Sequence, residues 1–408
     1  MFLYIDPGTG SMLFSLFIGI AASAVFLFRS LIIKLKFVFS GGKAVARGDE
    51  VAPYVIFSDS KRYWNVFEPI CDEFERRQIP VLFFTASPDD PALSREYKFV
   101  TAEFIGEGNA AFARLNMLRA DICLSTTPGL DVFQWKRSKE CRCYVHIPHS
   151  LDDLSVYRMF GIDFYDSILI SGSCQEKRVR EMEKLRNLPS KELVYAGSTY
   201  MDSLKSRFEK LETKAKNSRP VVLVAPSWGP SGILTRFGEK LISALAANDF
   251  DVVVRPHPQT VVSEKEILES LQTTFKGNEK VAWNFDNDNF DILNRADILI
   301  SDFSGVIFDF AFIFNKPVIY ADVAFDAGPY DADWFDEPMW TLRVLPEIGV
   351  QLKEEDFPRI GEIVNEALES QKLSENRDKA RNEVWTCIGE GAKNTVDYLV
   401  KKHTSDAQ

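Results

Sequence analysis

The sequence predicts an α/β protein with two doubly wound parallel-sheet domains that face a cleft, preceded by an amino-terminal transmembrane helix. Three observations indicate this class. Short apolar runs alternate with helical stretches along the chain, a pattern typical of parallel sheets. The 408 residues exceed one ordinary hydrophobic core and suit two α/β domains. An uncharged apolar run, 12–28, lies near the amino terminus and predicts the transmembrane helix.

The first 50 residues carry the membrane signal. The run 12–28 is about 17 residues long, which is the lower end for a spanning helix. Basic residues follow it over 29–47, whereas the only charged residue before it is Asp6. The positive-inside rule then predicts a single-pass protein of the cell membrane with its soluble domains in the cytoplasm. A cleaved signal peptide is the rival interpretation, but it expects basic residues before the apolar run.

The soluble part divides at a polar stretch near its middle. We expect an amino-terminal α/β domain over 51–216, a carboxy-terminal α/β domain over 217–350, and helices with a polar tail over 351–408. In the first domain, apolar runs predict strands at 53–57, 81–84, 120–125, 143–147, 167–170 and 193–195. No Gly-x-Gly-x-x-Gly motif occurs there, so the dinucleotide-binding fingerprint is absent. The last helix is expected to pack back on this domain.

The composition excludes some classes of function. Lys and Arg together number 48 and Asp and Glu number 59, so the formal net charge is −11. General nucleic-acid binding needs a basic surface, and we therefore expect no nucleic-acid partner. The six cysteines form no Cys-x-x-Cys pair and several lie in apolar runs. This pattern predicts reduced core cysteines in a cytosolic compartment and no metal site.

Two of the four histidines, His146 and His149, lie at the carboxyl end of the strand 143–147 and in the turn there. A histidine at the carboxyl end of a strand faces the crevice where such folds bind ligands, and it can act as a general base. The alternative is a structural histidine satisfied by backbone groups, and the clustering favours function. Asp152 or Asp153 either orients the base or belongs to an acidic loop without a catalytic role.

In the second domain, apolar runs predict strands at 220–225, 252–254, 281–285, 298–300 and 318–320. Three of these strands end in polar loops that carry Ser227, then Arg255 and His257, then Asp302, Ser304 and Gly305. The carboxyl ends of parallel strands open on one edge of a sheet, where helix amino termini favour a phosphate. Arg and His side chains suit a phosphate or pyrophosphate. The alternatives are a Ser-Gly pair that only caps the buried helix 306–314, and a loop histidine beside a surface arginine.

Four motifs occur in order: APSWG at 225–229, RPHP at 255–258, SDFSGVIFD at 301–309 and KPV at 316–318. Their order and spacing resemble the CDP-glycerol glycerophosphotransferase family, the teichoic-acid primases and polymerases. The family pattern reads A-P-T-W, [RK]-x-H-P, [ST]-D-Y-S-S-x-x-F-D and K-P. The resemblance covers about 220–399 well and the first domain loosely. It implies the architecture called GT-B, two doubly wound domains that face each other across a cleft.

The resemblance implies roles for individual residues. His257 corresponds to the histidine that contacts the pyrophosphate of the donor, and Ser304 and Gly305 correspond to a Ser-Ser pair that binds donor phosphate. Asp309 corresponds to the Asp that holds the glycerol or the ribose of the donor. In the family, the base lies in a loop of the W-H-G-T-P type in the first domain. His146 is the match for the base and His149 is the second candidate, while Ser227, Arg255 and Asp302 are expected to support the donor site.

The resemblance also implies an activity. A membrane-anchored glycerophosphotransferase would move glycerol phosphate, or a related polyol phosphate, from CDP-glycerol to a prenyl-pyrophosphate-linked saccharide acceptor and release CMP, with no metal and no cofactor. Two rival functions stay open. One is a GT-B glycosyltransferase or epimerase that uses a UDP-sugar, because this fold serves many donors. The other is a non-catalytic, membrane-tethered scaffold of the same fold.

Overall fold

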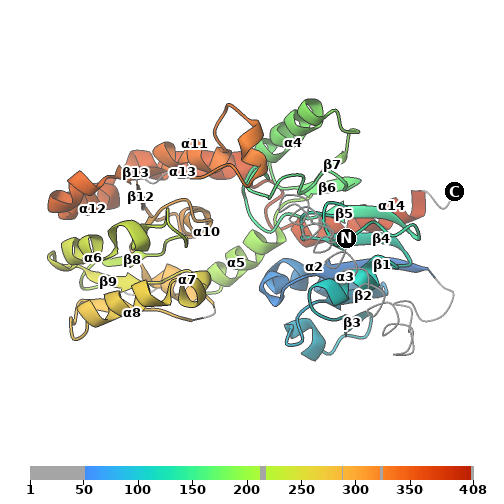
Figure 1. The fold of residues 1–408 in the computed structure, drawn as a ribbon, viewed down its shortest axis with the longest axis horizontal. Helices are drawn as coiled ribbons and strands as arrows, with labels where there is room; N and C mark the ends of the chain where they lie inside the picture. The colour runs from blue at the N-terminus through green and yellow to red at the C-terminus, as the bar shows by residue number, and fades with distance from the viewer. Residues whose placement is uncertain (1–50, 212–216, 287, 322–324, 406–408) are drawn as a thin grey trace, which may run out of the picture. The chain divides into compact units, whose positions relative to one another are not determined.

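The computed structural model describes residues 51–211, 217–286, 288–321 and 325–405, which belong to one compact unit that starts at Val51 (Figure 1). The predicted transmembrane helix, 12–28, and the basic segment after it lie outside the described residues. Within the described part of the chain, every helix is too short or too polar to cross a bilayer.

The first sheet has seven parallel strands in the order β3-β2-β1-β4-β5-β6-β7. Its strands are β1 (Ala52–Ser58), β2 (Val81–Thr85), β3 (Val100–Phe104), β4 (Ala120–Ser125), β5 (Cys141–His146), β6 (Ser167–Ile170) and β7 (Glu192–Tyr195). The central strands are buried on both faces, which explains their continuous apolar sequence. The edge strand β3 was missed by the sequence analysis, because its sequence VTAEF is partly polar and its second, fourth and fifth residues are exposed.

The second sheet has six parallel strands in the order β10-β9-β8-β11-β12-β13. They are β8 (Val221–Val224), β9 (Asp251–Val254), β10 (Val281–Trp283), β11 (Ile298–Ser301), β12 (Val318–Ala321) and β13 (Gly349–Leu352). Two doubly wound parallel sheets therefore confirm the predicted α/β class. The edge strand β13 was also missed, because only two of its four residues are buried.

Helices connect the strands of both sheets and complete the carboxyl end (Figure 1). In the first half they are α2 (Trp64–Arg77), α3 (Asn109–Leu115), α4 (Ser173–Arg186) and α5 (Thr199–Glu209). In the second half they are α6 (Ile233–Ala246), α7 (Pro258–Ser263), α8 (Lys265–Thr274), α9 (Phe290–Arg295), α10 (Val306–Ile313) and α11 (Trp340–Ile348). The carboxyl end forms α12 (Ile360–Glu369), α13 (Gln371–Val384) and α14 (Gly391–Ser405).

The last helix, α14, packs back on the first sheet, as expected from the sequence. Val396 and Leu399 are buried in the same cluster as Tyr54 and Ile56 of β1. A salt bridge between Arg77 of α2 and Asp397 of α14 closes the contact at 2.6 Å. The chain therefore returns to its first domain after it has completed the second sheet.

The topology places one crevice at the carboxyl edge of each sheet. In the first sheet the connections diverge after the neighbours β1 and β4, and in the second sheet they diverge after β8 and β11. Loops that leave neighbouring strands in opposite directions open a gap, and open α/β sheets bind their ligands there. These four loops are therefore the expected sites of chemistry.

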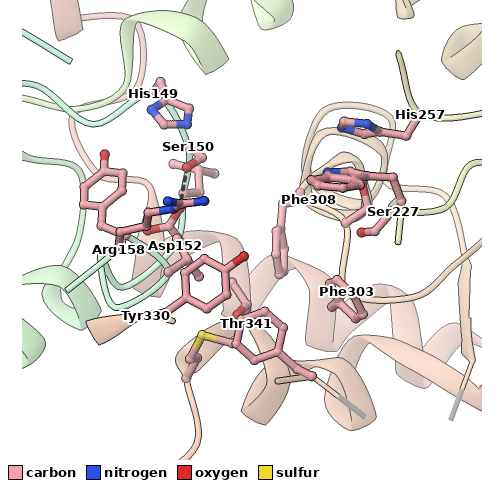
Figure 2. Close-up of a pocket in the computed structure, with 18 of the residues that line it drawn as sticks. His149, Ser150, Asp152, Arg158, Ser227, His257, Phe303, Phe308, Tyr330 and Thr341 are labelled. Carbon is pink, nitrogen blue, oxygen red and sulfur yellow. Dashed lines mark hydrogen bonds between the residues drawn. The ribbon is translucent and has the colours of Figure 1, made fainter. Parts of the chain in front are cut away.

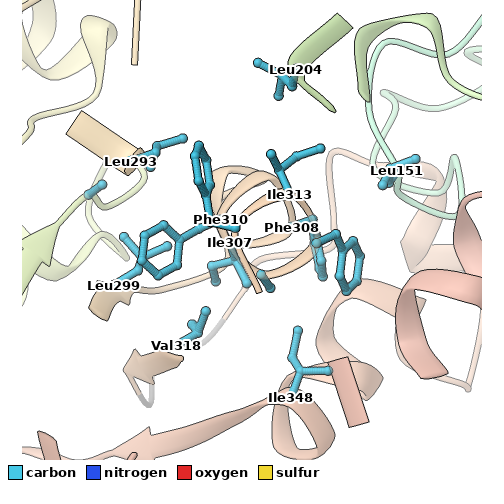
Figure 3. Close-up of a cluster of buried hydrophobic side chains, with 14 of the residues drawn as sticks. Leu151, Leu204, Leu293, Leu299, Ile307, Phe308, Phe310, Ile313, Val318 and Ile348 are labelled. Carbon is cyan, nitrogen blue, oxygen red and sulfur yellow. The ribbon is translucent and has the colours of Figure 1, made fainter. Parts of the chain in front are cut away.

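Helix α10 is buried on almost every side, and its apolar side chains form the centre of a large cluster (Figure 3). Ile307 and Phe310 are fully buried beside Leu299 of β11. The same cluster includes Leu151 and Leu204 from the first half of the chain. A helix that is apolar all round is fixed by its surroundings rather than by its own polarity pattern. The amino end of α10 is thereby held at the carboxyl edge of the second sheet.

Replacing Gly172 with alanine is expected to lower the free energy of unfolding by about 1–3 kcal/mol, the usual cost of overpacking. Gly172 precedes α4, and a Cβ atom there would lie 2.4 Å from the carbonyl oxygen of Glu383 and 2.6 Å from Val384. The obstacle is backbone, so it has little freedom to move away. Urea unfolding measures the effect, with Gly328→Ala as the control because only the side chain of Asp326 lies near that position. Equal stability of the two variants would contradict the close contact.

Candidate active site

A cavity of about 1000 Å³ lies where loops from the carboxyl edges of both sheets meet (Figure 2). From the first sheet, its wall includes Arg62 after β1, Pro128 after β4 and His149 after β5. From the second sheet, the wall includes residues 227–231 after β8 and 303–305 after β11. Both topological switch points therefore open into the same space, which is the default ligand site of such a fold.

The loop after β11 presents a helix amino terminus to this cavity. Ser304 and Gly305 line the wall, and Gly305 directly precedes α10. Apart from the adjoining residues and the backbone of the helix, no atom of the described residues lies within 4 Å of the position that a Cβ of Gly305 would occupy. The free backbone amides and the dipole of α10 make this end suitable for a phosphate. The structure thus brings both predicted phosphate-binding residues into the cavity.

His257 lines the same cavity from the loop after β9. Its Nδ1 atom accepts a hydrogen bond from the backbone amide of Gln259 at 3.0 Å, so it caps the first turn of α7. The proton of the neutral imidazole must then be on Nε2, which can donate it to an anion. Burial lowers the pKa of His257, and the nearby guanidinium of Arg62 lowers it further. His257 is therefore a neutral hydrogen-bond donor at physiological pH.

Three other predicted donor-side residues have different positions. Ser227 lines the cavity, and its backbone amide donates to the carboxylate of Asp302 at 2.9 Å. Asp302 is buried and also accepts from the amide of Ile233, so it holds the loop after β8 instead of facing the cavity. Arg255 is not part of the wall, because its guanidinium donates to Asn284 and to the carbonyl of Asp286 at 2.7 Å.

Asp309 lines the cavity from the first turn of α10. The hydroxyl of Tyr200, from α5, donates to its carboxylate at 2.8 Å. Burial raises the pKa of Asp309 to about 7, so the carboxyl group is partly protonated at neutral pH. A group in this state both donates and accepts hydrogen bonds, which suits the recognition of a hydroxyl on a ligand.

On the opposite wall, His149 is the histidine that faces the cavity. Its Nδ1 atom lies 3.3 Å from the hydroxyl of Thr126, and its ring packs on Tyr63 with 4.8 Å between the ring centroids. Burial lowers the pKa of His149 to about 4, so the imidazole is neutral and can accept a proton at physiological pH. His149 and His257 lie on facing walls of the cavity in Figure 2.

His146 lies behind this wall. It is the last residue of β5, is fully buried and is not part of the cavity lining. Its Nε2 atom lies 3.0 Å from the hydroxyl of Tyr157, and burial lowers its pKa to about 3. Among the described residues, no group forms a hydrogen bond with its Nδ1 atom. The structure therefore brings His149, and not His146, together with the donor-side loops.

Segment 325–341 lines the cavity and is also held against the first domain. Phe325, Tyr330, Met339 and Thr341 line the cavity. The buried carboxylate of Asp331 meanwhile accepts hydrogen bonds from the first-domain backbone, and the backbones of Arg158 and Tyr330 form an antiparallel bridge. The segment thus joins the loop after β12 to the loop that carries His149.

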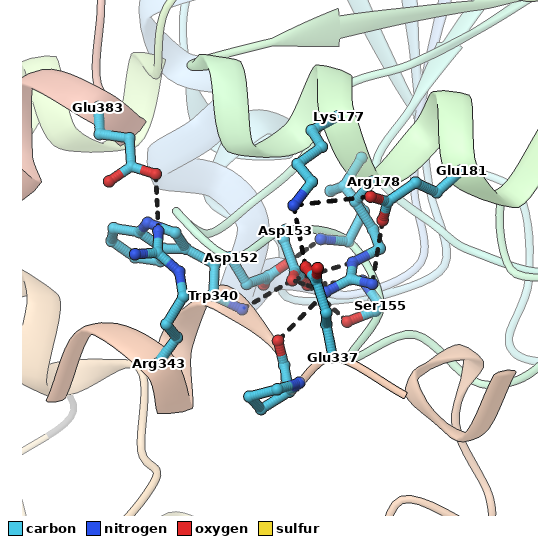
Figure 4. A network of polar contacts seen from close by, with 12 residues as sticks. Asp152, Asp153, Ser155, Lys177, Arg178, Glu181, Glu337, Trp340, Arg343 and Glu383 are labelled. Atoms are coloured by element: carbon cyan, nitrogen blue, oxygen red, sulfur yellow. Dashed lines mark hydrogen bonds and ion pairs between the residues drawn. The ribbon is translucent and has the colours of Figure 1, made fainter. Parts of the chain in front are cut away.

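The aspartates after His149 support this junction instead of orienting a histidine (Figure 4). Asp153 is buried and accepts from the backbone amide of Trp340 at 2.8 Å and from Arg178 at 3.2 Å. Arg178 also donates to the carbonyl of Pro338. Asp152 accepts from Ser150 and from the amide of Leu154. Neither carboxylate contacts His149 or His146 among the described hydrogen bonds.

The thiols and acidic residues form no visible metal centre. Within the described residues, no group of three or more His, Cys, Asp or Glu side chains is arranged to hold a metal ion. All six cysteines are free thiols, and all except Cys387 are buried.

Replacing Gly305 with alanine is expected to weaken donor binding about tenfold, which is about 1.4 kcal/mol, without unfolding the protein. The backbone of Gly305 is helical, with φ −57° and ψ −22°, and the added methyl group meets no protein atom. Only a ligand that approaches the backbone would collide with it. Calorimetric titration with CDP-glycerol measures the affinity and a thermal melt measures stability. Unchanged affinity would show that the donor does not approach Gly305.

Replacing Asp309 with asparagine is expected to stabilise the protein above pH 7 by on the order of 2 kcal/mol. The pKa of Asp309 is raised from 3.8 to about 7, so ionisation of this buried carboxyl group destabilises the native state above pH 7. This destabilisation of the wild type decreases as the pH falls from about 7 towards 4. The difference in the free energy of unfolding between wild type and variant should therefore decrease as well. Urea unfolding from pH 5 to pH 8 measures the difference. A constant difference across this range would contradict the raised pKa.

Part of the chain matches one family of enzymes. Residues 162–334 match the model of the family described as CDP-Glycerol:Poly(glycerophosphate) glycerophosphotransferase. This match includes the loops that carry His257, Ser304, Gly305 and Asp309, but not His149. No curated protein sequence matches the chain significantly.

Similar solved structures show the same fold. A structure of a variant of the wall teichoic acid polymerase TagF, soaked with CDPG, has a TM-score of 0.58 and 14% identity, and the alignment covers 94% of this chain and 99% of that one. A putative UDP-N-acetylglucosamine 2-epimerase from Listeria monocytogenes has a TM-score of 0.56 and 12% identity, with 88% and 98% covered. UDP-GlcNAc 2-epimerase from Neisseria meningitidis, bound to UDP-GlcNAc, has a TM-score of 0.52 and 15% identity, and the alignment covers 85% of this chain and 99% of that one. These likenesses confirm the GT-B-like arrangement of two parallel-sheet domains.

The family match confirms the resemblance found in the sequence and the predicted enzyme class, a transferase of the CDP-glycerol glycerophosphotransferase type.

Proposed function

We propose that the chain transfers glycerol phosphate, or a related polyol phosphate, from CDP-glycerol to a hydroxyl group of a membrane-linked acceptor and releases CMP. One observation supports this most strongly. A single cavity contains a helix amino terminus with Ser304 and Gly305, a histidine donor at His257, and a second, neutral histidine at His149 on the facing wall. These groups match the two needs of phosphoryl transfer, which are a proton acceptor and a site for the leaving phosphate.

In the proposed reaction, the diphosphate of the donor lies against the amino end of α10. The acceptor hydroxyl gives its proton to Nε2 of His149 while its oxygen attacks the phosphorus that carries glycerol. The bond between this phosphorus and the bridging oxygen breaks, and CMP leaves with that oxygen. The Nε2–H group of His257 and the amides at Ser304 and Gly305 stabilise the charge on the departing phosphate. The products are CMP and a phosphodiester.

We assign the base to His149 because it faces the cavity, whereas His146 is fully buried behind Tyr157. The proton on Nδ1 of His149 can be donated to the hydroxyl of Thr126, which leaves Nε2 free to accept a proton. His146 then supports the wall through its contact with Tyr157.

The acceptor and the location are further parts of the proposal. The uncharged run 12–28 and the basic residues over 29–47 favour attachment to the cell membrane with the catalytic part in the cytoplasm. A prenyl-pyrophosphate-linked saccharide is available only at a bilayer surface, so it is the acceptor class that an anchored enzyme reaches. The proposed chemistry uses neither a cofactor nor a metal ion.

Release of CMP from CDP-glycerol by the full chain, with a prenyl-pyrophosphate-linked saccharide in detergent, tests the proposal. We expect release that depends on the acceptor and that His257→Ala lowers at least tenfold. A thermal-shift comparison of CDP-glycerol with UDP-GlcNAc separates this function from the UDP-sugar alternative. Stabilisation by UDP-GlcNAc alone, or full CMP release by the His257→Ala variant, would overturn the proposal.

A further inference from the structure

The turn after β1 contains a cation that no motif in the sequence indicated. Residues Lys61–Tyr63 form a single 3₁₀ turn between β1 and α2, at the switch point of the first sheet. The hydroxyl of Ser60 caps this turn by accepting from the backbone amide of Arg62. The amide of Lys61 donates to Ser87 at 3.0 Å and its ammonium group pairs with Asp89. The turn is therefore anchored on the side away from the cavity.

Arg62 itself lines the cavity and is exposed. No carboxylate among the described residues forms an ion pair with its guanidinium, although the chain has an excess of acidic residues. Its neighbour Lys61, by contrast, has a carboxylate partner outside the cavity. A guanidinium that lines a cavity without a carboxylate partner among the described residues can bind an anion.

Arg62 also lies close to the donor loops of the second sheet. Both Arg62 and His257 line the cavity, and the positive charge of Arg62 contributes to the lowered pKa of His257. The Nδ1 atom of His257 is already bonded to Gln259, which leaves its Nε2–H group for a ligand. Two hydrogen-bond donors that line one cavity, of which one carries a positive charge, are suited to a phosphate.

We propose that Arg62 is a donor-binding residue contributed by the first sheet, and that its guanidinium contacts the diphosphate held at Ser304 and His257. This inference rests on the proposed function for the identity of the donor, but the anion site itself does not need it. The bidentate guanidinium bridges two phosphate oxygens and stabilises the charge that collects on the CMP phosphate as the bond to phosphorus breaks.

The position of Arg62 also connects donor binding with the base. Tyr63, the next residue in the turn, packs on the ring of His149. A diphosphate bound to Arg62 would therefore fix the turn against which His149 is packed. The bound diphosphate would also connect the two sheets, because Arg62 of the first sheet and Ser304 of the second would both hold it.

The test compares Arg62→Gln with Lys61→Gln in the full chain. Calorimetric titrations use CMP, cytidine, inorganic pyrophosphate and CDP-glycerol as separate probes. We expect Arg62→Gln to raise the Kd for CMP, pyrophosphate and CDP-glycerol about tenfold and to leave the Kd for cytidine within twofold of wild type. Lys61→Gln should bind all four probes as wild type does, because its charge is paired with Asp89 away from the cavity. Arg62→Lys should restore part of the loss, since it returns the charge without the two parallel donors.

The outcomes separate this inference from the proposed function. Wild-type affinity of Arg62→Gln for CMP and pyrophosphate would overturn the role of Arg62 and leave the transferase proposal intact. Binding of pyrophosphate that depends on Arg62, with no binding of CDP-glycerol or CMP by the wild type, would support the anion site and overturn the proposed donor. An equal loss in Arg62→Gln and Lys61→Gln would reduce the effect to general electrostatics and overturn the inference.

Discussion

Replacing His149 with glutamine is expected to lower the rate of CMP release by about 10²–10⁴-fold, the usual contribution of a general base. Glutamine keeps a polar side chain next to Thr126 but cannot accept the proton of the acceptor hydroxyl. The wild-type rate should depend on the neutral imidazole, whose pKa burial lowers to about 4. We therefore expect kcat/KM to stay level from pH 7 down to about pH 5 and to fall below that, a limb that the variant lacks.

His146→Gln is the matched control, because it makes the same change on the same strand-end loop behind the cavity wall. We expect it to lower thermal stability through the lost contact with Tyr157, while the rate per folded molecule stays within about threefold of wild type. Single-turnover CMP release, with the folded fraction measured by circular dichroism, distinguishes the two variants. A large loss of rate in His146→Gln with little loss in His149→Gln would reverse the assignment of the base.

Replacing Asp331 with alanine is expected to lower the free energy of unfolding by about 3–5 kcal/mol, the usual cost of breaking a buried ion pair. Asp331 is fully buried and accepts from the backbone amides of Phe160 and Gly161, with 2.8 Å to the first. Its carboxylate also pairs with Arg186, whose other partner is Asp163 at 2.6 Å. Alanine would leave the guanidinium half paired and two amides without acceptors.

Asp333→Ala is the control for this change, because Asp333 lies exposed in the same 3₁₀ turn. We expect the control to change stability by less than about 0.5 kcal/mol, as surface substitutions usually do. Urea unfolding of both variants measures the difference. If both variants unfold with the wild-type midpoint, segment 325–341 is not held to the first domain by Asp331.

Much of the donor side of the site could be predicted from the sequence. The apolar runs before Ser227, His257 and Ser304 are long enough to mark buried parallel strands, and the order of such strands alone places their following loops at one edge. Apart from Asp309, helix α10 is apolar along its length, so its burial could also be predicted from the sequence. The pattern could not show in which direction each side chain points after its strand ends. Arg255, for example, lies in the same loop as His257, but its guanidinium donates to Asn284.

The first domain was harder to predict because its important contacts join distant parts of the chain. His146 and His149 are three residues apart, and only the packing of Tyr157 and Tyr63 decides which one faces the cavity. Arg62 carries no local motif, and it becomes a candidate only because it lines the same cavity as His257, almost two hundred residues later. A short stretch of sequence does not contain both Tyr63 and His149, or both Arg62 and His257.

The sequence by itself predicted the two parallel sheets and the loops at their carboxyl edges that carry Ser227, His257 and Ser304, because buried strands and helix ends follow from local apolar and polar patterns. Only the tertiary structure decided which of His146 and His149 faces the cavity, that segment 325–341 joins the two domains through Asp331, and that Arg62 and His257 line the same cavity. The physical reason is that these choices depend on packing and charge between residues far apart in the chain, and such contacts exist only after both sheets have formed.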